Sequence, residues 1–177
     1  QTGFAMLCEN DPQEVMDLAP VAHLAAIKGR VPFINFFDGF RTSHEIQKVA
    51  AWDYADLASM LDTDALAAFR ARGLNPNHPE MRGSHENGDI FFQNREASNL
   101  HYDALPGVVE EYMGRINEKL GTDYRLFNYY GAPDADRVIV AMGSVCGAAE
   151  EVADFLNAQG QKVGLIKVRL YRPFCPD

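Results

Sequence analysis

A nearly continuous apolar run at residues 31–37, Val-Pro-Phe-Ile-Asn-Phe-Phe, constrains the fold more than any other feature of this sequence. A strand with one face in water alternates apolar and polar residues, whereas an unbroken run is typical of a strand covered on both faces in a parallel sheet. Residues 3–7, Gly-Phe-Ala-Met-Leu, form a shorter run of the same kind. Two such strands joined by a helix make a right-handed βαβ unit, so the chain is expected to be α/β.

The segment between these two runs carries the signals of an amphipathic helix. Asp11 suits the N-cap, Pro12 the first helical position, and Glu14 the third. Apolar residues then recur at helical spacing as far as Gly29. Pro20 interrupts the pattern, and because an interior proline loses a backbone hydrogen bond, the sequence predicts a kink there.

A second βαβ pattern closes the chain. Residues 137–142 are predicted to be a buried strand, a helix follows that opens at Gly143-Ser144, and residues 162–171 alternate as a second strand. The same periodicity predicts three more helices, at residues 52–61, 63–72 and 106–120.

Residues 74–100 lack any periodicity and carry Pro76, Pro79, Gly83 and Gly88 among polar side chains. A structureless stretch of this length is uncommon inside one compact domain. It is therefore the best candidate for a crossing between two domains.

The composition excludes several classes of function. The chain has 177 residues, of which 47% are hydrophobic and 23% charged, enough for an ordinary globular core. A net charge of -9 without a basic run argues against binding to nucleic acid or to an anionic membrane surface. No apolar stretch approaches the roughly 20 residues that span a bilayer. Three widely separated cysteines, Cys8, Cys146 and Cys175, favour a reducing compartment, so we expect a cytoplasmic protein.

Four longer strings, together with the short Val15–Leu18, carry a resemblance to one enzyme family: Gln1–Leu7, Pro32–Val49 (with its Phe-Phe-Asp-Gly-Phe-Arg-Thr-Ser-His-Glu-Ile-Gln-Lys), Tyr129–Ser144 and Gly164–Phe174. On these strings the chain resembles pyruvate:ferredoxin (flavodoxin) oxidoreductase almost from end to end. The resemblance implies a much longer enzyme that uses thiamine diphosphate, Mg²⁺, [4Fe-4S] clusters and coenzyme A. Such an enzyme oxidatively decarboxylates pyruvate to acetyl-CoA and CO₂ and passes the electrons to ferredoxin or flavodoxin.

The resemblance also implies a division into domains. Residues 1–75 would be the end of a thiamine diphosphate pyrimidine-binding type domain, residues 76–104 an extended crossing, and residues 105–177 the start of a transketolase C-terminal-like domain. Each domain would have a parallel sheet flanked by helices. The family's catalytic glutamate is expected before Gln1, and its diphosphate and cluster sites after Asp177. This segment would then be mainly a scaffold in a homodimer, inactive by itself.

The residues themselves predict no cofactor or metal site within the chain. An iron-sulfur cluster needs about four cysteine thiolates, usually closely spaced, and the three cysteines include no Cys-x-x-Cys. Neither a carboxylate set for Mg²⁺ and diphosphate nor a Gly-x-Gly-x-x-Gly motif is present. Four histidines lack the spacing of metal ligands: His23, His78, His85 and His101.

A possible loop next to an active site follows the apolar strand and contains Asp38, Arg41, Ser43 and His44. Open α/β sheets bind ligands at the carboxyl ends of their strands. Arg41 could recognise a carboxylate there, and His44 could transfer a proton. We favour the alternative, in which Asp38 opens a turn, Thr42 caps a helical turn and Arg41 pairs with a neighbouring domain.

Two further positions have a functional and a structural interpretation. Gly143-Ser144 could cradle a phosphate at a helix N-terminus, although a tight turn with a serine N-cap is favoured. Cys146 could have a lowered pKa at the same helix end, although an inert core residue is favoured.

Two alternatives to a pyruvate enzyme stay open. The first is another 2-oxoacid:ferredoxin oxidoreductase, which would use 2-oxoglutarate or an aryl pyruvate. The second is a noncatalytic α/β interaction module, which should begin with methionine and hide its strand edges, whereas this chain begins at Gln1. Both chain ends look cut, and we expect residues 1–177 to aggregate when expressed alone.

Overall fold

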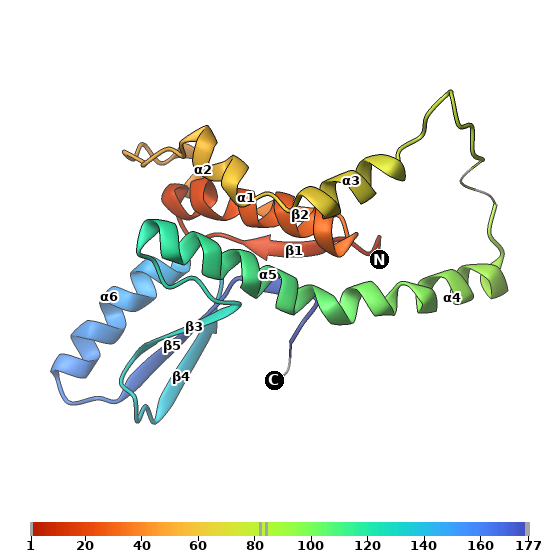
Figure 1. The fold of residues 1–177 in the computed structure, drawn as a ribbon. Helices are drawn as coiled ribbons and strands as arrows, with labels where there is room; N and C mark the ends of the chain where they lie inside the picture. The colour runs from red at the N-terminus through yellow and green to blue at the C-terminus, as the bar shows by residue number, and fades with distance from the viewer. Residues whose placement is uncertain (1, 82, 84, 176–177) are drawn as a thin grey trace.

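In the computed structural model, residues 2–81, 83 and 85–175 are described, and within them the strands form two three-stranded sheets (Figure 1). The first sheet has the strand order β2-β1-β6 and the second the order β3-β5-β4. Each sheet contains one of the two predicted βαβ units, which confirms the α/β class. The two sheets are joined by the chain itself and by a cluster of polar side chains.

The first unit consists of β1 (Ala5–Cys8), α1 (Pro12–Gly29) and β2 (Phe33–Phe36). β1 and β2 are parallel, as predicted. The helix begins where the capping residues predict, because the Asp11 side chain accepts a hydrogen bond from the Glu14 backbone N–H at 2.9 Å.

The second unit consists of β3 (Phe127–Gly131), β4 (Arg137–Ala141), α6 (Val145–Ala158) and β5 (Val163–Val168). β4 and β5 are parallel, as predicted, but β3 is antiparallel to β5. β6 (Leu170–Arg172) is likewise antiparallel to β1. Both sheets are therefore mixed, and the expectation of purely parallel sheets is wrong.

The predicted strand at residues 162–171 divides at Arg169 and serves both sheets. β5 before it belongs to the second sheet, and β6 after it to the first. The Arg169 backbone N–H donates to the Leu126 carbonyl at 2.9 Å, and its own carbonyl accepts from the Cys8 N–H at 2.8 Å. After this change of sheet β6 pairs antiparallel with β1, a pairing that the apolar pattern did not predict.

The apolar edge strands are less buried than predicted. In β4, Val138, Ile139 and Val140 are 45%, 45% and 65% exposed, and Ile34 of β2 is 40% exposed. Among the described strands, both lie at sheet edges and have a neighbour on one side only. Their sequences are those of fully covered strands, so the described chain leaves part of this apolar surface open.

The segment between the two units is more helical than expected. After the short turn η1 (Thr42–His44), the predicted helices at 52–61 and 63–72 appear as α2 (Tyr54–Ser59) and α3 (Thr63–Ala71). The stretch predicted to be irregular contains α4 (Gly88–Ala97), which leads directly into α5 (Asn99–Leu120). α4 buries none of its residues and projects away from the body (Figure 1). A helix without a buried face has no apolar periodicity to detect.

α5 supplies much of the core by packing across α1. Leu105, Val109, Tyr112, Met113 and Ile116 are each at most 1% exposed and meet the buried faces of α1 and β1. These are largely the residues that the helical spacing places on one face.

The predicted division of the chain into domains at residues 75 and 105 stays a prediction. The helix that follows the predicted crossing, α5, packs on the first unit. Among the described helices, none combines the length and hydropathy that crossing a bilayer requires.

Pro20 lies inside α1, and another side chain satisfies the carbonyl that it leaves unpaired. Proline has no N–H, so the Met16 carbonyl four residues earlier loses its helical donor. The indole Nε1–H of Trp52 donates to that oxygen at 3.0 Å. Gln13 also accepts from the Ala50 N–H at 2.8 Å, so the segment before α2 is held on α1.

Candidate functional site

The ends of three strands meet at a polar joint between the two units, which we define by Glu9, Asn10, Glu14, Asp38, Ser144 and Arg169. Asn10 follows β1, Asp38 follows β2, and Gly143-Ser144 follows β4 and opens α6. The carboxyl ends of strands are the usual ligand-binding edge of an α/β sheet. In this chain, side chains that connect the two units fill most of this edge.

Side chains of the first unit cap the N-terminus of α6. The Asp38 carboxylate accepts from the Ser144 N–H at 2.8 Å and from the Ser144 hydroxyl at 2.5 Å. Asn10 Oδ1 accepts from the Gly143 N–H at 3.1 Å. The bonds from Ser144, chiefly that from its hydroxyl, lower the pKa of Asp38, so the carboxylate is ionised and faces the positive end of the helix.

This capping bears on the two interpretations of Gly143-Ser144, a phosphate site and a tight turn with a serine N-cap. The position that could cradle a phosphate holds the Asp38 carboxylate instead. Ser144 is the N-cap residue of α6, as favoured, but its side chain makes no capping bond to its own helix. The capping group comes from a residue 106 positions earlier in the chain.

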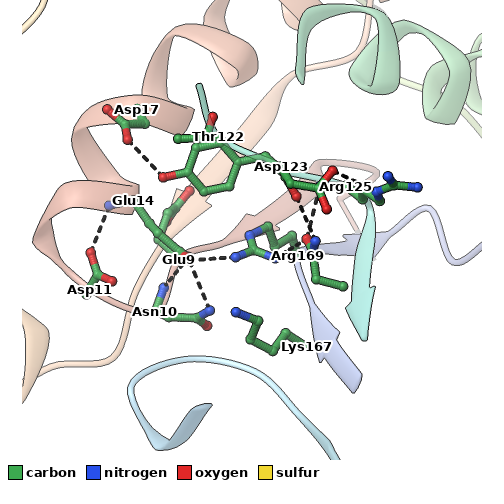
Figure 2. Close-up of polar contacts among 12 residues, drawn as sticks. Glu9, Asn10, Asp11, Glu14, Asp17, Thr122, Asp123, Arg125, Lys167 and Arg169 are labelled. Carbon is green, nitrogen blue, oxygen red and sulfur yellow. Dashed lines mark hydrogen bonds and ion pairs between the residues drawn. The ribbon is translucent and has the colours of Figure 1, made fainter. Parts of the chain in front are cut away.

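An ion pair between Glu14 and Arg169 forms the buried centre of the joint (Figure 2). Arg169 Nη2 lies 2.5 Å from Glu14 Oε1, and the two side chains are only 3% and 10% exposed. Glu14 also accepts from the Asn10 N–H at 3.0 Å, and Arg169 Nη1 donates to the Asn128 side chain. One guanidinium therefore connects α1 of the first unit to β3 of the second.

Two neighbouring interactions extend this network. The Tyr124 hydroxyl donates to Asp17 at 2.8 Å, and burial together with that carboxylate raises the pKa of Tyr124. Lys167 Nζ lies 2.6 Å from Glu150 Oε1. Between the units, a cavity of about 200 Å³ is lined by Glu14, Glu150 and Lys167 and by Asn10 and Cys146.

Glu9 is the exceptional member of the joint. The residue is 0% exposed, and neither carboxyl oxygen has a hydrogen-bond partner in the described part of the chain. Burial, and then the charge of Glu14, raise the pKa of Glu9 to about 9. The side chain is therefore an uncharged carboxylic acid at neutral pH.

The predicted loop residues are brought together only in part. Arg41 and His44 line an open cavity of about 570 Å³ with Phe40, Glu45 and Ser144. The Ser43 hydroxyl instead accepts from the Phe40 N–H at 2.9 Å and is hydrogen-bonded to His44 Nδ1. Asp38 points into the joint, as its cap on α6 requires. A role for Arg41 or His44 in chemistry stays a prediction.

The two fully buried cysteines are not activated. Burial raises the pKa of Cys146 to about 11 and that of Cys8 to about 12, so the lowered pKa considered for Cys146 is wrong. Among the residues placed by the structure, no three His, Cys, Asp or Glu side chains gather in a group that could hold a metal ion.

Comparison with known proteins identifies the family. Residues 1–114 match the family model described as "Pyruvate flavodoxin/ferredoxin oxidoreductase, thiamine diP-bdg", and residues 135–177 match "Pyruvate:ferredoxin oxidoreductase core domain II". The chain belongs to the pyruvate flavodoxin/ferredoxin oxidoreductase family. The resemblance carried by the four strings is thereby confirmed.

The relatives are much longer than this chain. The pyruvate-flavodoxin oxidoreductase of Enterobacter agglomerans is 64% identical over 173 residues, which are 98% of this chain and 15% of the relative. The pyruvate:ferredoxin oxidoreductase of Moorella thermoacetica is 59% identical over 177 residues, 100% of this chain and 15% of the relative. The chain thus spans about 15% of the length of these relatives.

One solved structure confirms the fold at low sequence identity. A 2-oxoglutarate:ferredoxin oxidoreductase from Magnetococcus marinus aligns with a TM-score of 0.54 and 20% identity. The alignment covers 96% of this chain and 31% of the other.

Sequence reasoning missed the importance of Asn10, Glu14 and Arg169 in the joint. The local sequence pattern identifies Glu14 only as a carboxylate that caps a helix. It identifies Arg169 only as a residue on the polar face of an alternating strand. The charge of Arg169 between the apolar residues Val168 and Leu170 was the available signal, because a charged side chain is seldom buried without a partner. Its partner lies 155 positions away, which no local pattern specifies.

Proposed function

We propose that this chain is a segment of a thiamine diphosphate-dependent pyruvate:ferredoxin or pyruvate:flavodoxin oxidoreductase, in which it fixes the orientation of two domains. The observation that carries the proposal is the polar joint, in which Asp38 caps α6 and Arg169 pairs with Glu14 across the two units. The high identity to named pyruvate oxidoreductases along the whole chain supports the choice of enzyme.

The exposed apolar edges support a place within a larger protein. β4 and β2 have the sequences of covered strands, yet both are exposed at the edges of three-stranded sheets. Burying apolar area stabilises a protein by roughly 25 cal/mol per Å², so a longer chain would gain by covering them. The same exposed edges would make residues 1–177 prone to aggregation when expressed alone.

Two features of the described residues argue against a diphosphate or cluster site within this segment. The helix N-terminus that could bind a diphosphate is occupied by Asp38, and the two fully buried thiols, Cys8 and Cys146, have raised pKa values. We therefore assign thiamine diphosphate, Mg²⁺, the [4Fe-4S] clusters and the coenzyme A site to other parts of the enzyme. Ferredoxin or flavodoxin would be its electron acceptor, and the enzyme would be a cytoplasmic homodimer.

The proposal is tested by the intact mass and visible spectrum of the native protein, purified without oxygen. A mass several times 19.7 kDa, with the broad visible absorption of iron-sulfur clusters and CoA-dependent oxidation of pyruvate, is expected. Activity on 2-oxoglutarate in place of pyruvate would favour another 2-oxoacid:ferredoxin oxidoreductase. A colourless species of 19.7 kDa would replace the enzyme with an α/β interaction module.

A further inference from the structure

The buried carboxyl of Glu9 is an unused acceptor at the centre of the joint. Glu9 follows β1 and continues the alternation of Ala5 and Leu7, which are both 0% exposed, so it lies on the buried side of the first sheet. Both of its oxygens lack a hydrogen-bond partner within the described residues. A buried polar group in this condition costs free energy, so its retention calls for a partner in some state of the protein.

Arg169 has the complementary unused donor. Its Nη1 donates to Asn128 and its Nη2 to Glu14, while its Nε has no hydrogen-bond partner within the described residues. A guanidinium carries five N–H donors in a fixed planar fork and binds carboxylates well in more than one orientation. Arg169 is only 3% exposed, so its Nε–H does not readily donate a hydrogen bond to water.

The charges around Glu9 explain why it is uncharged beside this donor. Glu14 raises its pKa and Arg169 lowers it, so both lie within electrostatic range. On α1, Asp17 is a further buried carboxylate, bonded to the Tyr124 hydroxyl. The other titratable neighbours, Cys8, Cys146 and Tyr124, have raised pKa values and are neutral, and Lys167 is paired with Glu150. Arg169 thus already has a carboxylate partner in Glu14, and a negative charge on Glu9 would be repelled by Glu14.

We propose that Glu9 is a reserve ion-pair partner for Arg169, so that Glu9 and Glu14 are alternative carboxylates for one guanidinium at the joint of the two sheets. While Glu14 holds Arg169, Glu9 keeps its proton. When Glu14 loses its charge or moves away, the O–H bond of Glu9 breaks, its proton passes to solvent and the Glu9 carboxylate takes the guanidinium. No electrons are transferred. The joint stays closed in both states, and the exchange is coupled to one proton.

Amide hydrogen exchange in the protein expressed at the full length of its gene tests this proposal. The N–H groups of Cys8 and Arg169 report on the joint, since they bond to the carbonyls of Arg169 and Leu126. The variants are Glu9→Gln, Glu14→Gln and the double variant, with Glu110→Gln on the exposed face of α5 as the matched control. Each replacement removes a charge and keeps the size of the side chain.

The expected result is a strong non-additivity. At neutral pH each single variant changes exchange at these amides by less than about threefold, whereas the double variant accelerates it at least about tenfold, because only then does Arg169 lack a carboxylate. If Glu14→Gln alone loosens the joint as much as the double variant does, Glu9 is no reserve partner. Unchanged exchange in all variants would also overturn the proposal.

Infrared spectroscopy gives a second readout that does not need a stable double variant. The carbonyl stretch of protonated Glu9, assigned by its loss in Glu9→Gln, should be present in the unmodified protein at neutral pH. The same band should vanish in Glu14→Gln as Glu9 ionises to take Arg169. A band that persists in Glu14→Gln contradicts the exchange of partners.

Discussion

The cap that Asp38 places on α6 offers the sharpest test of how the two units are held together. Asp38→Ala removes the two hydrogen bonds that its carboxylate accepts from α6, from the Ser144 N–H at 2.8 Å and from the Ser144 hydroxyl at 2.5 Å, together with a longer one from the Thr42 hydroxyl at 3.5 Å. Loss of an N-cap costs about 1 kcal/mol, and a hydrogen bond to a charged group contributes about 1.5 to 3 kcal/mol. Because both bonds share one carboxylate, a combined cost of about 2 to 3 kcal/mol is expected.

This cost should appear as local opening of the first turn of α6. A loss of about 2 to 3 kcal/mol corresponds to roughly 30-fold to 150-fold faster amide exchange there, at about 1.4 kcal/mol for each factor of ten. Exchange measured by mass spectrometry on the full-length protein provides the assay. Asp38→Asn keeps an acceptor without the charge and should give a smaller effect, below about tenfold.

The matched control is Asp136→Ala, because Asp136 is an exposed residue of the same unit as α6. Protection of the first turn of α6 should be unaffected in that variant. If Asp38→Ala changes this protection no more than Asp136→Ala does, Asp38 does not hold the units together and the proposed scaffold role fails at its central contact.

Three further predictions concern other parts of the chain. Trp52→Phe leaves the Met16 carbonyl without its indole donor and should cost about 1 to 3 kcal/mol, measured as faster amide exchange in the middle of α1. Gly131→Ala would place a Cβ 2.5 Å from the Val163 carbonyl oxygen at a φ of +107°, so we expect loss of the β3–β5 pairing and more than about 2 kcal/mol of destabilisation in thermal unfolding. Glu9 has a raised pKa, so above pH 4.5, the ordinary pKa of a glutamate, it holds a proton in the folded state that it releases on unfolding. The contribution of protonated Glu9 to the free energy of unfolding is fully present below pH 4.5. It is lost as the pH rises towards the folded-state pKa of about 9, by at most about 1.4 kcal/mol per pH unit. Glu9→Gln should therefore flatten the plot of unfolding free energy against pH in this range.

Local sequence patterns predicted most of the helices and strands, because their causes are local. Asp11 and Pro12 set the start of α1, and the spacing of Val109, Tyr112 and Ile116 set the buried face of α5. α4 was missed for the opposite reason. It buries no residue, so its sequence has no apolar stripe, and only the three-dimensional structure shows it to be helical.

What the sequence by itself determined is the pair of βαβ units and the family to which they belong, since both follow from residues that are neighbours along the chain. Only the tertiary structure decided how the units meet. The cap of Asp38 on Ser144 and the pairing of Glu14 with Arg169 join residues 106 and 155 positions apart. A buried charge is tolerated only where a partner reaches it, and which partner does so depends on where the folded backbone brings the two side chains.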